Sequence, residues 1–227
     1  MKSDLDKASS VLHDLKPPPT LTETALQAIK ESIVYKVLKP GVLYTELAIA
    51  KQLGISKTPV REALINLSSR GFVTIIPRKG FQVNQLSESN IEEIFEFRVS
   101  LEEFIVKRVI ENLDEASLEK LESILDRSET TEDKKDFLKL DKEFHSYLAL
   151  LSGNRYAMDA SRKIWDLCEW VGAEVFMLRG RPESASKEHR ELLESLKQRD
   201  LEAAVRSMKN HIANVRKLFL QIVKSTK

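Results

Sequence analysis

Residue types that ligate metals occur on the apolar faces of predicted helices, where polar side chains are unexpected. They are Asp141, His145, His189 and His211. Asp141 and His145 are four residues apart, which places a carboxylate and an imidazole on adjacent turns of one helix, suited to chelating one ion. Burying such groups is costly unless they are paired or coordinated. A single histidine is more simply a core residue bonded to a backbone carbonyl, but three with an aspartate favour a shared metal site.

A cation also interrupts an apolar face. Arg98 lies on a stripe with Ile91, Phe95 and Ile105. One interpretation is an ion pair with Glu102, four residues further along the helix. The other is a buried cation that awaits an anionic ligand, commonly a carboxylate. The two arrangements can alternate, so Arg98 is a candidate effector-binding residue.

The elements that position these residues fall into two parts. Residues 21–86 predict three helices followed by a two-stranded ribbon. The first helix begins at a Thr20/Glu23 capping box and stops at Pro40-Gly41. Its buried face comprises Leu26, Ile29, Ile33, Val34 and Val37. Gly54 ends the short second helix.

Residues 87–227 are almost purely helical in pattern. Helices are expected near 88–112, 115–127, 132–152, 155–178, 183–198 and 200–225. The predicted fold class is therefore mainly α: an N-terminal winged helix-turn-helix domain and a C-terminal all-α bundle of six or seven helices. Residues 1–20, which contain three consecutive prolines, are expected to form an extension outside the first domain.

The tight turn at Gly54 between two short helices is typical of a helix-turn-helix. The second of these helices, near 57–70, would be the recognition helix, because short polar and cationic groups at its start suit phosphates and base edges. The candidate DNA-binding residues there and at the hairpin tip are Ser56, Lys57, Thr58, Arg61, Arg78, Lys79 and Gly80. The alternative is a small structural or protein-binding winged helix.

Composition limits the classes of protein. The chain has 227 residues, of which 42% are hydrophobic and 31% charged, a mixture that excludes a disordered chain. A single cysteine excludes an internal disulfide and Cys-rich zinc sites. No apolar run reaches the roughly 18 residues that span a membrane, and the N-terminus does not resemble a secretory signal, so a cytoplasmic protein is expected.

The net charge of +1 argues at first against nucleic-acid binding. Its distribution removes the objection. Residues 21–86 hold nine Lys and Arg against four Asp and Glu, a net charge of +5, and 87–227 carry −4. A basic small domain is thus joined to an acidic large one.

The basic domain resembles the GntR family of bacterial transcriptional regulators. The resemblance lies in Leu53 to Leu64, in Gly71-Phe72-Val73 and in Pro77 to Val83. It departs at Lys57, where many members carry arginine. The resemblance implies binding to double-stranded operator DNA as a homodimer.

The helical half resembles the ligand-sensing domain of the FadR-like subfamily, in an FCD-type form. The motifs are Arg98-x-x-Leu101-Glu102, Asp141-x-x-Phe144-His145, Gly153-Asn154, Glu188-His189 and His211. The resemblance implies a divalent metal (zinc, nickel or manganese) on Asp141, His145, His189 and His211. Water or a carboxylate effector would complete the coordination, with Arg98 beside the effector pocket.

Together these features predict a transcriptional regulator, not an enzyme. A small organic acid bound at the metal site would modulate operator binding, with repression as the expected output. Two alternatives remain: a metal-dependent hydrolase with a nucleic-acid-targeting domain, and a regulator with a structural metal and a protein input.

Overall fold

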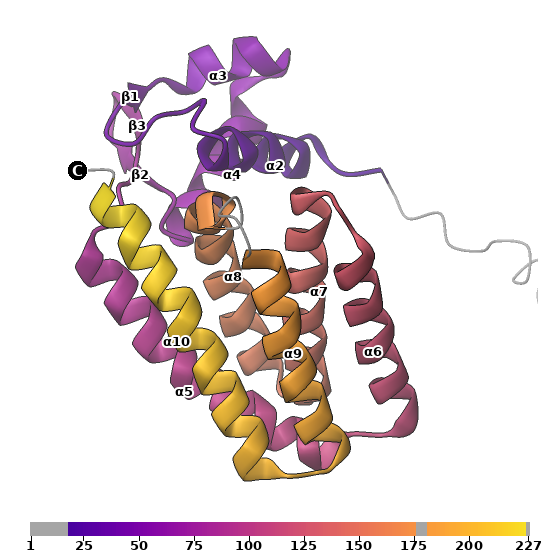
Figure 1. Ribbon diagram of the computed structural model, residues 1–227. Coiled ribbons are helices and arrows are strands. Elements are labelled where there is room, and N and C mark those ends of the chain that lie inside the picture. The colour runs from indigo at the N-terminus through magenta and orange to yellow at the C-terminus, as the bar shows by residue number, and fades with distance from the viewer. Residues whose placement is uncertain (1–17, 176–180, 226–227) are drawn as a thin grey trace, which may run out of the picture.

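The computed structural model describes residues 18–175 and 181–225. A small domain of mixed structure lies across one end of a bundle of long helices, with α2 (Leu21–Val34) passing over the ends of α7 and α8 (Figure 1). The two parts have separate hydrophobic cores. Within the described residues, no helix is both long and apolar enough to span a membrane.

The small domain confirms the three predicted helices and the ribbon, and adds a strand. After α2, its elements are β1 (Leu43–Tyr44), α3 (Glu46–Leu53), α4 (Lys57–Ser69), β2 (Val73–Ile76) and β3 (Gly80–Val83). The strands form an antiparallel sheet in the order β1-β3-β2. The sequence did not predict β1, because two residues are too few for an alternating pattern.

The first helix begins as predicted and ends earlier. Thr20 and Glu23 form the capping box. The helix stops at Val34, and Lys36 adopts a φ of 58°. Val37 therefore leaves the helix and is 71% exposed, so its predicted place on the buried face is wrong; Leu38 is buried instead.

The turn between α3 and α4 follows the prediction. Gly54 caps α3 with a φ of 67°, a left-handed conformation that glycine adopts without steric cost. α4 buries Ala63, Leu64 and Leu67 against the rest of the small domain, which leaves its other face to solvent.

The larger part confirms the all-α prediction. Its six described helices are α5 (Glu88–Asn112), α6 (Glu115–Thr130), α7 (Lys134–Leu151), α8 (Arg155–Val175), α9 (Arg181–Lys197) and α10 (Leu201–Ser225). α10 packs along both α5 and α9, and α7 contacts α5, α6 and α8. The faces that carry the predicted ligands on α7, α9 and α10 therefore turn toward one interior.

Candidate functional site

Three histidine rings from three different helices meet in the interior of the bundle. His145 comes from α7, His189 from α9 and His211 from α10. One ring nitrogen of each lies within 4.8 Å of the others, and all three residues are 2% exposed or less. Residues that lie between 22 and 66 positions apart in the sequence thus form one cluster.

Asp141 lies at the edge of this cluster. It is 3% exposed, and its Oδ1 is 3.6 Å from Nε2 of His189. All four predicted ligands are therefore brought together, with Asp141 one helical turn before His145.

The donor set and its dimensions fit a divalent metal. Nε2 of His145 and Nε2 of His189 are 3.2 Å apart. In a tetrahedral zinc site with Zn–N bonds of about 2.0–2.1 Å, two ligand nitrogens lie about 3.3 Å apart. Imidazole with carboxylate suits zinc and neighbouring first-row metals. Three imidazole nitrogens and one carboxylate oxygen could hold such an ion.

A carboxylate outside the cluster orients His211. Nδ1 of His211 lies 2.7 Å from Oε2 of Glu188, and Nδ2 of Asn214 donates to Oε1 of Glu188 at 2.9 Å. With Nδ1–H donating to the carboxylate, Nε2 of His211 is the nitrogen open to a metal. Helical spacing did not predict this role for Glu188, although Glu188 directly precedes His189.

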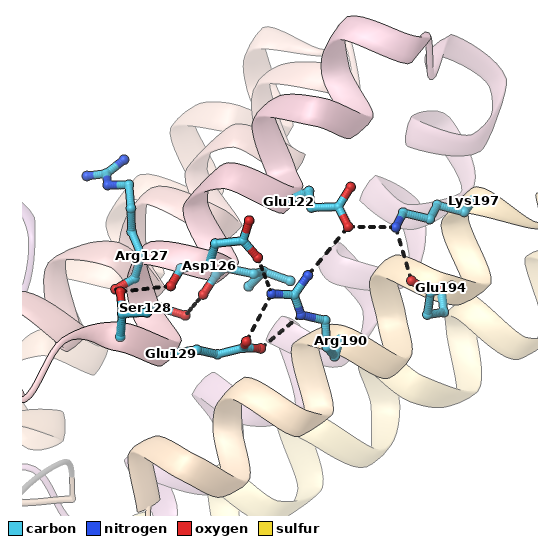
Figure 2. A network of polar contacts seen from close by, with 10 residues as sticks. Glu122, Asp126, Arg127, Ser128, Glu129, Arg190, Glu194 and Lys197 are labelled. Atoms are coloured by element: carbon cyan, nitrogen blue, oxygen red, sulfur yellow. Dashed lines mark hydrogen bonds and ion pairs between the residues drawn. The ribbon is translucent and has the colours of Figure 1, made fainter.

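The helix that carries His189 is fixed against α6 by an ion-pair network (Figure 2). Arg190 donates to Oδ1 of Asp126 at 2.6 Å and to Oε1 of Glu129 at 2.8 Å. These hydrogen bonds, Glu129 foremost, raise the pKa of Arg190 above its ordinary value. The network holds the backbone one residue from His189 and so limits movement of that ligand.

Arg98 is buried within the helical bundle, and its role in effector binding stays a prediction. Its Nε lies 3.8 Å from Oε1 of Glu102, and Nη1 contacts Sγ of Cys168 at 3.7 Å. Both members of the ion pair are 2% exposed or less. Among the described residues, Nε and Nη2 of Arg98 have no hydrogen-bond partner. A buried guanidinium with unused donors is costly, and an anion would satisfy them.

Glu102 links Arg98 to the histidine cluster. Its Oε1 is also 3.8 Å from Nδ1 of His145. Burial raises the pKa of Glu102 to about 7, although the Arg98 guanidinium opposes the shift. The carboxyl group can therefore exist neutral near pH 7, which would release Arg98 for another anion.

Trp165 of α8 forms one wall of this site. Its ring lies 4.8 Å from the His145 ring, and the Arg98 guanidinium is 5.0 Å from its centroid. Its buried Nε1 has no hydrogen-bond partner in the described part of the chain. Burial raises the pKa of the neighbouring Cys168 thiol. Trp165 is therefore part of the hydrophobic core and also contacts the candidate ligands.

The predicted DNA-binding residues lie on an exposed surface of the small domain. Those exposed at the start of α4 are Ser56, Lys57, Thr58 and Arg61. Arg78 and Lys79 are exposed at the turn between β2 and β3, and Gly80 is half-buried. A cationic helix start and a cationic hairpin tip are therefore both open to solvent, as a winged helix requires for DNA.

Two family descriptions cover most of the chain. Residues 21–83 match "Bacterial regulatory proteins, gntR family", and residues 93–214 match the FCD domain. The transcriptional regulator YdhC of Bacillus subtilis is 31% identical over 201 residues, which cover 86% of this chain and 89% of YdhC. The repressor RspR of Escherichia coli is 25% identical, with 92% of each chain covered.

Solved structures share the fold. McbR of Escherichia coli superposes with a TM-score of 0.76 at 23% identity, covering 90% of this chain and 99% of McbR. A metal-free FCD domain aligns with a TM-score of 0.54 at 25% identity, covering 63% of this chain and 99% of that domain.

Proposed function

The chain belongs to the GntR family of bacterial transcriptional regulators and carries an FCD domain, and on this premise we propose that a metal ion and a small organic acid bound in the helical domain control its binding to operator DNA. The observation that carries this proposal is the convergence of three buried imidazoles with Asp141 nearby. FCD domains often bind metals, and this cluster has the donors to do so.

The metal ligands would be Asp141, His145, His189 and His211. The test is the metal content of purified protein after zinc loading and dialysis. The double variant His189→Ala/His211→Ala should lose bound zinc, because two of the three nitrogen ligands are removed. His13→Ala is the matched control, because His13 lies outside the described residues and has no predicted ligand role. Full zinc occupancy in the double variant would refute the site.

Arg98 would receive the carboxylate of the effector. Its unused Nε and Nη2 donors and the nearby Nε1–H of Trp165 suit an anion. Thermal unfolding with a panel of small carboxylic acids, with and without zinc, should identify acids that raise the melting temperature. The double variant Arg98→Met/Glu102→Gln should lose this response while remaining folded, because no buried charge is left without its partner.

If no carboxylate stabilises the wild type, the alternative of a structural metal with a protein input is favoured. The hydrolase alternative is excluded by the comparisons, since the relatives and the matched families are transcriptional regulators rather than enzymes.

GntR regulators bind operator DNA and commonly dimerise. We infer a homodimer in which two α4 helices enter major grooves about one helical turn apart on double-stranded operator DNA. The DNA contacts would come from Ser56, Lys57, Thr58, Arg61, Arg78, Lys79 and Gly80. Repression relieved by the effector, in the bacterial cytoplasm, is the proposed mode of action, in keeping with the name of RspR as a repressor.

A further inference from the structure

A buried lysine of the small domain is held by two carboxylates of the helical domain. Lys30 of α2 is 5% exposed, and its Nζ donates to Oδ1 of Asp166 at 2.6 Å and to Oε2 of Glu169 at 2.8 Å. Both acceptors lie on α8. Desolvation opposes the charged form, but these hydrogen bonds raise the pKa of Lys30 above its ordinary value. The domains are thus joined by a charged contact shielded from water.

The same carboxylate holds the recognition helix. Nη1 of Arg70, the C-cap residue of α4, donates to Oδ2 of Asp166 at 2.7 Å. Beside it, the Phe72 ring stacks on the Trp170 ring with centroids 5.2 Å apart. Asp166 therefore binds both α2 and the end of α4, while the start of α4 stays free for DNA.

The contact of Lys30 and Arg70 with α8 is called the junction below. On α7 and on α8, residues of the junction directly follow residues of the candidate metal and effector site. Trp165, which packs on His145 and Arg98, directly precedes Asp166. On α7, Asp141 directly precedes Lys142, whose Nζ donates to Glu169 at 2.9 Å. A shift of α7 or α8 at the site must therefore also move Lys142 or Asp166, and with them the contacts around Lys30.

We propose that Lys30 and Arg70, with Asp166 and Glu169 on α8, form the coupling contact through which occupancy of the histidine site sets the orientation of the recognition helix. The proposal rests on the proposed function, because the site must bind a ligand to have an effect. Lys30, Arg70 and Asp166 act here as positioning residues, and none of them is among the predicted DNA contacts or metal ligands.

The side chains of the junction have open space beside them into which they can move. A crevice of about 400 Å³ opens between α2, α7 and α8 beside Lys30, Trp165 and Glu169. The contact between domains is therefore made by a few side chains beside open space rather than by a closed core. The contacts of Lys30 and Arg70 are also short hydrogen bonds between charged groups, and such bonds are made only up to about 3.2 Å, so a shift of α8 by about 1 Å would break them.

Thermodynamic reciprocity supplies the test. If zinc binding at the histidine site and the contact between the domains are coupled, the coupling is reciprocal, so a variant that weakens the contact must also change the affinity for zinc. Zinc affinity is measured by isothermal titration calorimetry on the full chain for wild type, Lys30→Met and Arg70→Met. We expect both variants to change the zinc dissociation constant in the same direction by about fivefold or more, the lower end of typical coupling between sites.

Lys107→Met is the control. Lys107 also forms an ion pair, with Glu103 at 3.0 Å, but both residues lie on α5 and outside the network around Arg190. The zinc affinity of this variant should equal that of the wild type. Wild-type affinity in both Lys30→Met and Arg70→Met would overturn the coupling and leave the metal site intact. Failure of the wild type itself to bind zinc would overturn the metal site, and the coupling with it.

Discussion

The carboxylate of Glu188 and the imidazole of His211 form a 2.7 Å contact that fixes which nitrogen of the histidine faces the interior of the bundle. The two residues lie 23 positions apart, on α9 and α10. Asn214 holds the other oxygen of Glu188, so the carboxylate has little freedom to turn. The orientation of the His211 ring is therefore set by residues that are not themselves candidate metal ligands.

Replacing Glu188 by glutamine should weaken zinc binding about 10- to 100-fold, because the charged partner that orients His211 and raises its basicity is lost. The dissociation constant is measured by competition with a chelator of known affinity. Glu191→Gln, an exposed change on the same helix, is the control and should leave zinc affinity unchanged. Equal affinities in the two variants would show that the contact has no part in metal binding.

Much of the site could be predicted from helical spacing, because each ligand lies on a face whose other members are apolar. Ala185, Leu192 and Leu196, which share a face of α9 with His189, are buried, and Arg98 lies among buried residues. The spacing of apolar residues at a period of 3.6 indicates which side of a helix faces inward. This spacing placed the candidate ligands of three helices on inward faces.

The contacts between elements could not be predicted in this way. Lys30 and Asp166 are 136 positions apart, and no local spacing relates a lysine on α2 to a carboxylate on α8. From the sequence alone, a lysine such as Lys30 is expected at the surface, but the packing of α2 on α8 buries it. The early end of α2 was missed for a related reason: Lys36 takes a positive φ without the glycine that usually marks one.

Arg61→Ala should lower operator affinity about tenfold or more, since Arg61 is exposed near the start of α4 and would contact base edges or phosphates. Affinity is measured by fluorescence anisotropy at fixed salt, because phosphate contacts make it salt-dependent. Arg162→Ala removes another exposed arginine, from the helical domain, and should have little effect. An unchanged affinity in Arg61→Ala would contradict the assignment of α4 as the recognition helix.

Gly80→Ala should destabilise the small domain by about 2 kcal/mol or more, because backbone strain and a steric clash add. Gly80 has a φ of 139°, and a Cβ there would clash with the carbonyl oxygen of Tyr44 on β1. Gly41→Ala is the matched control: its φ is also positive, at 76°, but nothing lies within 4 Å of the added Cβ. Its cost should be limited to backbone strain of about 1–2 kcal/mol.

Urea denaturation followed by circular dichroism compares these two glycine variants. A Gly80→Ala variant as stable as Gly41→Ala would show that β1 does not pack on β3 as described. The same measurement is needed to test the predicted DNA contact at Gly80. If Gly80→Ala loses operator affinity at a temperature where it is unfolded, the loss reflects unfolding and not a missing contact to DNA.

Phe97→Glu should convert a dimer to a monomer. Phe97 is 55% exposed and lines a surface hollow of about 620 Å³ between α5 and α8, together with Ile94, Ile164 and Leu167. Exposed apolar surface of this kind is typical of protein interfaces, and regulators of this family commonly dimerise. A carboxylate at this position would lose its hydration in the dimer, which costs several kcal/mol per ion.

Sedimentation equilibrium measures the change. Val37→Glu makes the same kind of substitution at a residue 71% exposed on the small domain and should leave the dimer intact. If Phe97→Glu dimerises as tightly as the wild type, the interface lies elsewhere on the bundle. If only Phe97→Glu is monomeric, it should also bind a two-half-site operator more weakly than the wild type, while its affinity for a single half-site stays the same, because each small domain still folds and presents α4.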